Sequence, residues 1–213
     1  IEYGYNYYSS NSSSGLGNFN KSKYSLLRDY LNRKKERIDS EYIIAFYTLI
    51  IYSFNNQIRF NKNNELNIPV GKRDFNKSLR KNLKSFMEKL NKTDIDFINM
   101  DFRKIDINSI SSNDFLYLDP PYLIANAAYN ESGKWTEKDE KDLLKFLDKV
   151  NKKGIKFALS NVIEHSGNEN YLLKDWVKKN NFNLNMLDFN YNNSNYQKKD
   201  KDSKSIEVLI TNY

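Results

Sequence analysis

The second half of the sequence alternates short apolar runs with segments of helical periodicity. The apolar runs, each typical of a strand, cover 96–100, 114–118, 155–159, 184–189 and 205–211. Helically spaced leucines follow Thr136, a good N-cap, and a second helix is expected over 169–179. This alternation predicts an α/β fold with a doubly wound, mostly parallel sheet. Ligands bind beyond the carboxyl ends of such strands, where we expect Asp101, Asp119 and Asn161.

The first half of the sequence shows no such alternation and favours helices with one hairpin. The expected elements are a helix containing Tyr24, Leu27 and Leu31, a buried helix over 42–54, a polar turn-rich segment over 55–72 and a basic helix over 76–90. Asn63 and Asn64 suit a hairpin turn. We therefore expect a region of helices and a hairpin over 1–92 and an α/β region over 93–213.

Composition limits the chemistry of the chain. Cysteine is absent, which excludes disulfides, cysteine-based zinc sites and thiol nucleophiles. The single histidine, His165, has no acidic cluster at metal spacing nearby, so no metal site is expected. No stretch approaches the ~18 apolar residues of a membrane span, and no signal peptide is visible, so we expect a cytoplasmic protein without a membrane partner. The net charge of +7 favours a polyanionic partner, although a basic protein without nucleic acid fits equally well.

The tetrapeptide Asp119-Pro120-Pro121-Tyr122 is the motif that carries chemistry. The Asp119 carboxylate and the Pro120 carbonyl offer two hydrogen-bond acceptors on a backbone that the prolines restrict. Two such acceptors suit an exocyclic amine whose lone pair is delocalised into its ring, because they favour the charge-developing transition state. Tyr122 offers an aromatic face for a base taken out of the duplex stack. Four residues are a short signal, and a plain strand-to-loop turn is the alternative.

Several further motifs, in the same order, make the chain resemble the Dam-like family of DNA adenine-N6 methyltransferases. Besides the tetrapeptide, these motifs lie at 54–61, 66–72, 159–161, 190–193 and 207–213. The resemblance covers nearly all of the chain. It implies a sheet of the S-adenosylmethionine-dependent methyltransferase type with a DNA-recognition insertion of helices and a hairpin. It also implies methyl transfer from S-adenosylmethionine to the N6 amine of adenine in a specific site of double-stranded DNA, with GATC suggested by the sequence around Arg59 and Pro69.

The resemblance also assigns roles to residues. The target-adenine site would consist of Asp119, Pro120, Pro121 and Tyr122, and the cofactor would contact Asp101, Phe102 and Asp119. The residues implied in DNA binding are Asn55, Asn56, Gln57, Arg59, Asn61, Pro69 and Lys72. Among them Arg59 is the best candidate for reading a guanine edge and Lys72 for contacting phosphate. Asn56 and Gln57 have the chemistry to pair with adenine.

The sequence departs from this family at its front. Family members begin with a Trp/Lys-containing segment and a Phe-x-Gly-x-Gly loop that hold the cofactor, whereas Gly15-Leu16-Gly17 sits in a polar stretch with no strand before it. We therefore expect the chain to lack the segment that completes the cofactor site. Three other readings stay open. They are a cytosine exocyclic-amine methyltransferase, in which Ser commonly replaces the residue at 119, an RNA or protein-amide methyltransferase, and a non-catalytic DNA-binding fragment.

Overall fold

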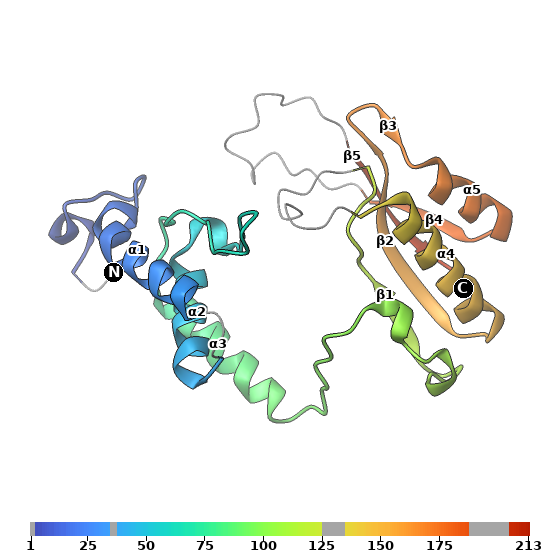
Figure 1. The fold of residues 1–213 in the computed structure, drawn as a ribbon, viewed down its shortest axis with the longest axis horizontal. Coiled ribbons are helices and arrows are strands. Elements are labelled where there is room, and N and C mark those ends of the chain that lie inside the picture. Colours follow the sequence, from blue (N-terminus) through green and yellow to red (C-terminus); the bar gives the residue numbers. More distant parts are fainter. Residues whose placement is uncertain (1–2, 35–37, 125–134, 188–204) are drawn as a thin grey trace. The chain divides into compact units, whose positions relative to one another are not determined.

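The chain folds into two compact units, Ile1–Phe97 and Ile98–Tyr213, each with its own hydrophobic core (Figure 1). The structure is a computed structural model that describes residues 3–34, 38–124, 135–187 and 205–213. The sequence predicts the boundary between the two regions after residue 92, and in the structure the two units meet five residues later, after Phe97. In these described ranges no helix combines the length and apolar character that crossing a membrane requires.

Two packed helices, α1 (Gly17–Arg33) and α2 (Ser40–Tyr52), build the first unit. Its buried core consists of Tyr24, Leu31, Leu49, Leu66 and Ile68. The hydroxyl of Tyr24 donates to the backbone carbonyl of Ile68 at 3.0 Å, so the polar end of this buried ring is satisfied. Asp39 starts α2 by accepting a hydrogen bond from a backbone N–H of the first turn. The helix expected to contain Tyr24, Leu27 and Leu31 and the buried helix expected over 42–54 are confirmed.

The polar segment 55–72 forms a hairpin. Two antiparallel bridges close it, Phe60 with Leu66 and Ser53 with Val70. At its tip the backbone N–H of Asn61 donates to the carbonyl of Glu65 at 2.8 Å. Asn64 adopts a left-handed conformation with a φ of 57°, which asparagine tolerates better than most residues. The hairpin turn expected at Asn63 and Asn64 is confirmed.

Helix α3 (Lys77–Leu90) follows the hairpin and has no buried side chain. The side chain of Asn76 caps it by accepting from the backbone N–H of Leu79 at 2.9 Å. This confirms the expected basic helix. The strand expected over 96–100 is wrong, because no described strand pairs with this run, and Phe97 and Ile98 are 79% and 73% exposed. Apolar residues alone do not make a strand when the backbone has no neighbour to bond.

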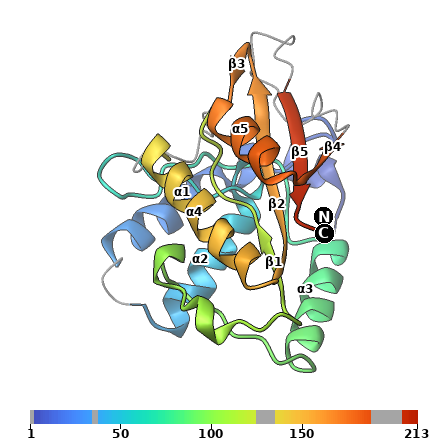
Figure 2. The ribbon, with the colours of Figure 1, turned by 90° about the vertical axis from the view of Figure 1, so that its right-hand side faces the viewer.

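The described residues of the second unit contain one mixed sheet with the strand order β1-β2-β5-β4, and β3 beside β2 (Figure 2). The strands are β1 (Phe115–Leu118), β2 (Lys156–His165), β3 (Asn168–Glu169), β4 (Asn183–Leu187) and β5 (Ser205–Thr211). Only β1 and β2 are parallel neighbours, joined by helix α4 (Glu137–Lys152). The other described pairs are antiparallel. The expectation of mostly parallel pairing is therefore wrong for the described strands, because β5 inserts in reverse between β2 and β4, which still point the same way as β1.

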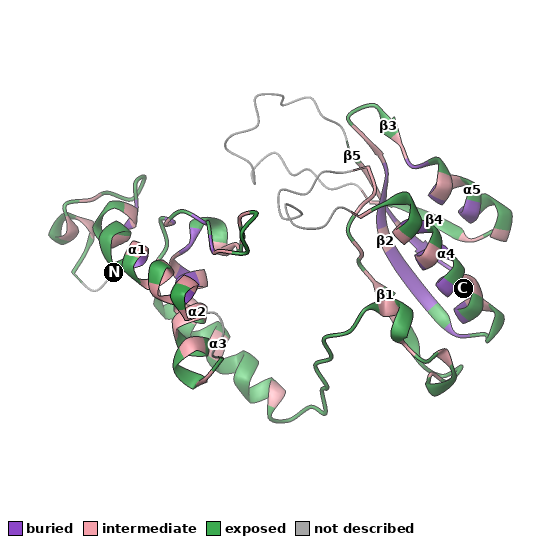
Figure 3. Ribbon diagram, in the orientation of Figure 1, coloured by how far each residue is buried: buried purple, intermediate pink, exposed green. Residues whose placement is uncertain are grey.

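Helices α4 and α5 (Tyr171–Asn180) pack on the same face of this sheet (Figure 1). The core between helices and sheet includes Leu147, Ile155, Phe157, Leu159, Leu173, Val208 and Ile210, all fully buried. Thr136 and Asp139 form a capping box that starts α4, as Thr136 predicts. Since side chains alternate along a strand, Phe115 and Tyr117 lie on the opposite face, where they are 54% and 63% exposed. Most of β2, by contrast, is buried (Figure 3).

Candidate functional site

The Asp-Pro-Pro-Tyr tetrapeptide starts directly after β1, at the carboxyl end of that strand. Leu118, the last residue of β1, packs against the core and pairs with Leu159 of β2. This anchors the backbone from which Asp119 projects with its side chain exposed. The expectation that Asp119 lies at the end of a strand is confirmed. Two consecutive prolines then restrict the backbone that carries the second acceptor, the Pro120 carbonyl.

The phenol of Tyr122 is tied to its surroundings on three sides. Its hydroxyl donates to Oδ1 of Asp119 at 3.2 Å. Burial raises the pKa of the Tyr122 hydroxyl, and a hydrogen bond from Ser160 of β2 opposes that rise. The nearby carboxylates of Asp119 and Glu207 raise this pKa further. Tyr122 is therefore a neutral donor over the physiological range, and Ser160 and Glu207 join the site from two neighbouring strands. Sequence reasoning did not assign either of them to it.

The sequence predicts Asn161 at the end of a strand, and this prediction is wrong. Asn161 lies in the middle of β2, because this strand continues to His165. Its side chain is fully buried and turns toward α4, where Nδ2 lies 3.4 Å from Oε1 of Glu140. The same Glu140 oxygen accepts from the side chain of Asn170 at 2.9 Å. Asn161 therefore has a structural role, since it links β2, which carries Ser160, to α4. The motif expected at 190–193 lies outside the described residues.

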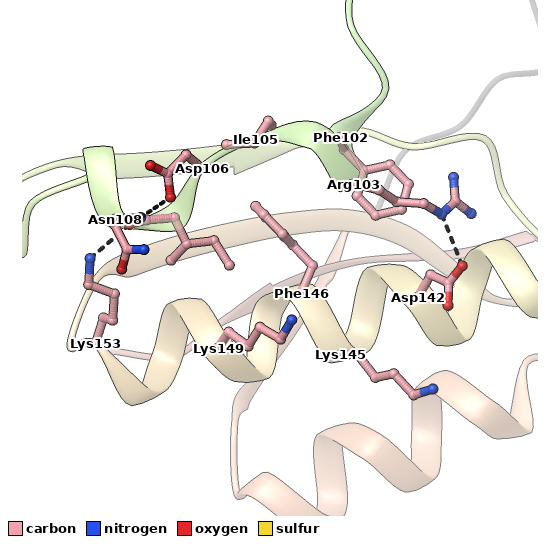
Figure 4. A pocket seen from close by; sticks show the side chains of 11 residues that line it. Phe102, Arg103, Ile105, Asp106, Asn108, Asp142, Lys145, Phe146, Lys149 and Lys153 are labelled. Carbon is pink, nitrogen blue, oxygen red and sulfur yellow. Dashed lines mark hydrogen bonds and ion pairs between the residues drawn. The ribbon is translucent and has the colours of Figure 1, made fainter.

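Asp101 and Phe102 begin a short 3-10 helix, Phe102–Lys104, that follows no strand. The Asp101 carboxylate accepts from the backbone N–H of Arg103 at 2.8 Å and pairs with its guanidinium at 3.0 Å. Arg103 also forms ion pairs with Asp139 and Asp142 of α4, and Figure 4 shows the latter. Hydrogen bonds from Thr136, and then from Arg103, hold the pKa of the Asp139 carboxyl at about 2.

Asp101 and Phe102 offer a hydrogen-bond acceptor beside an accessible aromatic surface. Asp101 is exposed and a carboxylate has more acceptor sites than Arg103 occupies, so it can accept from a hydroxyl or an amine. Phe102 is half-buried, with its ring centroid 6.0 Å from the rings of both Trp135 and Phe146, and it keeps part of its surface accessible. The Arg103 guanidinium lies 4.6 Å from the same ring centroid.

A groove of about 550 Å³ opens beside Phe102, between the segment 102–108 and α4 (Figure 4). Its apolar lining residues include Phe102, Ile105, Ile107 and Phe146, and its basic ones include Lys145, Lys149 and Lys153. Lys153 is engaged, since its ammonium donates to the carbonyl of Ile107 at 2.8 Å. Neither Asp101 nor Asp119 lines this groove, so it is distinct from the tetrapeptide.

Arg59 lies in the hairpin with one edge of its guanidinium already bound. Nε lies 3.0 Å from the backbone carbonyl oxygen of Asn67, and Nη2 donates to the same oxygen. Nη2 also lies 3.4 Å from Oδ1 of the Asn67 side chain. These bonds orient the group and leave Nη1 without an acceptor among the described residues, so this corner of the guanidinium can still approach a base edge.

Asn56 and Asn61 both act within the hairpin and its junction with α2. Nδ2 of Asn56 donates to the carbonyl of Ile51 at 2.8 Å, which satisfies an otherwise open carbonyl at the end of α2. Oδ1 of Asn61 accepts from the backbone N–H of Glu65 at 3.0 Å and closes the turn. Asn55 is exposed and Gln57 is half-buried. Of these four amides, Asn55 is therefore the most accessible to a DNA base.

Lys72 and Pro69 hold the base of the hairpin. The carbonyl of Pro69 accepts from the backbone N–H of Phe54 at 2.9 Å, and Nζ of Lys72 donates to the carbonyl of Ser13 at 2.8 Å. Gly15, at a φ of 61°, packs so closely here that an added Cβ would lie 2.4 Å from the carbonyl oxygen of Lys72. The glycines of Gly15-Leu16-Gly17 thus serve a close contact with the hairpin.

Comparison with known proteins covers both units of the chain. The family model of the D12 class N6 adenine-specific DNA methyltransferases matches residues 7–201. Modification methylase StsI of Streptococcus sanguinis is 42% identical over 205 residues, which are 93% of this chain and 30% of that protein. Type II methyltransferase M.FokI of Planomicrobium okeanokoites is 40% identical over 205 residues, with the same shares.

A third relative covers less of the chain. Type II methyltransferase M1.LlaDCHI of Lactococcus lactis subsp. cremoris is 30% identical over 166 residues, which are 75% of this chain and 54% of that protein. The chain spans about 30% of the length of the first two relatives. The family match nevertheless includes the hairpin, the tetrapeptide and the strands β1 to β4. The chain belongs to the D12 class N6 adenine-specific DNA methyltransferase family.

Proposed function

We propose that this chain carries the target-adenine site and the DNA-reading hairpin of an enzyme that methylates the N6 amine of adenine in double-stranded DNA. The observation that carries this proposal is the position of Asp119, exposed at the carboxyl end of a parallel strand and 3.2 Å from the hydroxyl of Tyr122. Membership of the adenine-specific family and the names of the relatives, modification and type II methylases, support it. The same names support a role in restriction–modification.

The chemistry proposed for the tetrapeptide rests on acceptors and one ring. The Asp119 carboxylate and the Pro120 carbonyl would accept hydrogen bonds from the two N–H groups of the adenine amine. These hydrogen bonds keep the lone pair of the amine available for attack. As the nitrogen gains positive charge, the Asp119 carboxylate stabilises it. The Tyr122 ring would stack on the flipped base. Its hydroxyl, held by Asp119 and Ser160, fixes the orientation of the ring.

S-adenosylmethionine would supply the methyl group, and Asp101 and Phe102 would hold its adenosine part. Asp101 offers the acceptor and Phe102 the aromatic surface. The Arg103 guanidinium, paired with Asp101, Asp139 and Asp142, fixes this corner to the first turns of α4. Catalysis would then consist of positioning and electrostatics.

The proposed fold is a doubly wound sheet of the S-adenosylmethionine-dependent methyltransferase type. The β1–α4–β2 unit, with its parallel strands, is the building block of such sheets. Two further features support it. β1 has a neighbour on one side only among the described strands, and the exposed Phe115 and Tyr117 mark a face that a doubly wound fold would cover with helices.

We further propose that the first region, 1–92, recognises DNA and that 93–213 is catalytic. The hairpin 55–72 projects amides and Arg59 from a packed helical base, which suits reading of base edges in the major groove. Asn67, by binding Nε and Nη2 of the Arg59 guanidinium, would hold the free Nη1 ready for an acceptor on the edge of a guanine.

The test of this function is the product formed on DNA. Duplexes containing GATC, and every single-base variant of it, would be incubated with S-adenosylmethionine and the protein, and the nucleosides analysed by mass spectrometry. N6-methyladenine is expected wherever the cofactor site is complete. N4-methylcytosine would favour the cytosine alternative. Cofactor binding without any product, or DNA binding without cofactor binding, would point to a non-catalytic role for the chain.

The matched variants for that test are Asp119→Ala and Asp96→Ala. Asp119→Ala is expected to lower kcat by ~10²-fold or more while DNA binding is retained, because the carboxylate acts on the amine in the transition state. Asp96 is an exposed aspartate outside every helix and strand, and its replacement should leave turnover unchanged. Normal turnover in Asp119→Ala would remove the assigned role.

A further inference from the structure

A groove of its own lies in the first unit, and none of the proposed DNA-reading residues lines it. It encloses about 1440 Å³ beside the first half of α3. Its aromatic lining residues are Tyr5, Tyr8, Phe19, Tyr52 and Phe75, and its basic ones are Lys77, Arg80, Lys81 and Lys84. We call it the α3 groove. Aromatic rings and cations facing one hollow are the combination that binds unpaired nucleic acid strands.

The four cations share one face of α3. Lys77, Arg80, Lys81 and Lys84 stand at positions i, i+3, i+4 and i+7, and all four are exposed. In the part of the chain that the structure describes, none of them is recorded in an ion pair. Asp74 is the acidic residue in the lining, so the groove has an excess of positive charge. A row of unpaired cations along a helix face suits a chain of phosphates.

The aromatic side of the groove offers a surface for a base. The rings of Tyr8 and Phe19 meet edge to face with centroids 4.9 Å apart, which holds Phe19 in place. Phe19 remains 57% exposed. Phe75 joins the aromatic and the basic sides, because the guanidinium of Arg80 lies 5.5 Å from its ring centroid. An exposed ring fixed by its neighbour loses little conformational entropy when a base stacks on it.

A third observation is a hydrogen-bond donor without an acceptor. Asn20 lines the α3 groove, and its Nδ2 atom is buried with no partner among the described residues. Buried donors are nearly always paired, so an unpaired one calls for an acceptor from outside the chain. A phosphate oxygen or a base carbonyl supplies one. Asn20 lies on the first turn of α1, directly after Phe19.

We propose that the α3 groove binds one unpaired strand of DNA, with its phosphates along α3 and a base stacked on Phe19. The inference rests on the proposed function in so far as DNA is the substrate. A duplex would reach the cations but keeps its bases stacked inside the helix and away from the rings. When an enzyme takes a base out of the duplex, the target and the base opposite it become unpaired, so unpaired nucleotides are present where this chemistry occurs.

The test is fluorescence anisotropy of the full 213-residue chain with a labelled oligothymidine and with a labelled duplex, at several salt concentrations. The charge variant combines Lys77→Ala, Lys81→Ala and Lys84→Ala. It should weaken oligothymidine binding and lower the salt slope by about two units, since three phosphate contacts are lost from a single strand. Phe19→Ala should weaken binding by about 5- to 150-fold without changing that slope, since it removes only stacking.

The matched control removes three exposed lysines from the second unit, in the variant Lys138→Ala, Lys178→Ala and Lys179→Ala. It should retain oligothymidine binding. Equal losses in the control and the charge variant would overturn the proposal, as would a wild-type chain that does not bind oligothymidine. Variants that lose only duplex binding would also overturn the proposal, since the aromatic rings would then not contribute to binding. Circular dichroism checks that each variant folds.

The experiments distinguish a failure of this inference from a failure of the proposed catalytic function. Asp119→Ala should bind oligothymidine like the unmodified chain even when it makes no N6-methyladenine. If no methylated base forms but Phe19→Ala still weakens oligothymidine binding, the groove stands and the catalytic assignment fails. If N6-methyladenine forms but Phe19→Ala does not weaken oligothymidine binding, the catalytic assignment stands and the proposed role of the groove fails.

Discussion

The indole nitrogen of Trp135 lies 2.7 Å from Oε2 of Glu140, a side chain with no exposed surface. The other carboxylate oxygen accepts from Asn161 of β2 and from Asn170, the N-cap of α5. Three N–H donors from three parts of the chain thus converge on one carboxylate. Asn161 is next to Ser160, which contacts Tyr122, so Glu140 fixes the floor of the candidate site.

Replacing Glu140 by Gln should lower the free energy of unfolding by about 1–3 kcal/mol. The shape is kept, but an NH2 group then faces N–H donors and one of them loses its acceptor. Urea denaturation followed by circular dichroism measures the change. Glu137→Gln is the matched control on the same helix, because Glu137 forms only an exposed ion pair with Lys141, and it should cost less than about 0.5 kcal/mol. Equal costs for both variants would contradict a structural role for the buried network.

The capping box of α4 should lose strength in acid. The folded pKa of Asp139 is about 2 against an ordinary value of 3.8, chiefly because Thr136 donates to it. A lowered folded pKa means that Asp139 stabilises the fold above about pH 4 and that this contribution disappears as the pH falls toward 2. Asp139→Asn should therefore flatten this part of the curve of stability against pH. Asp175→Asn, on an exposed position of α5, is the matched control. Parallel curves for the two variants would show that Asp139 has no such linkage.

Tyr122 should retain the flipped base through its ring and not through its hydroxyl. Tyr122→Ala is expected to weaken this retention by ~1–3 kcal/mol, the scale of a base stacked on an aromatic side chain. Tyr122→Phe loses the hydrogen bond to Asp119 but keeps the ring, and should retain the base nearly as well. Fluorescence of 2-aminopurine at the target position reports the unstacked base. The same signal from Tyr122→Ala and from the unmodified protein would exclude stacking.

Arg59 should discriminate one base of the target site. Arg59→Ala is expected to relax discrimination at that position by ~1–3 kcal/mol, measured as methylation of the cognate duplex and all single-base variants. Lys62→Ala, at the exposed tip of the same hairpin, should affect all sequences alike. An equal loss on every duplex in Arg59→Ala would mean that the bond to Asn67, and not base reading, is the role of this residue.

Local signals in the sequence predict the elements well, while long-range relationships escape it. The hairpin turn at Asn64 and the cap at Thr136 depend on contacts within four residues, and both are confirmed. The buried Glu140 resembles any acidic residue in the first turn of a helix, a position that the helix dipole favours, so nothing local marks it. The hydrogen bond of Ser160 to Tyr122 and the electrostatic effect of Glu207 on it depend on which strands become neighbours, and the sequence pattern does not specify that order.

The insertion of β5 between β2 and β4 has a consequence for the order of folding. During synthesis β4 emerges before β5, yet β5 is the only described strand beside it. The backbone of β4 therefore stays without a sheet partner until β5 has left the ribosome, and the core lacks Val208 and Ile210 until the same moment. The last of the described strands to be made is the one that closes the sheet.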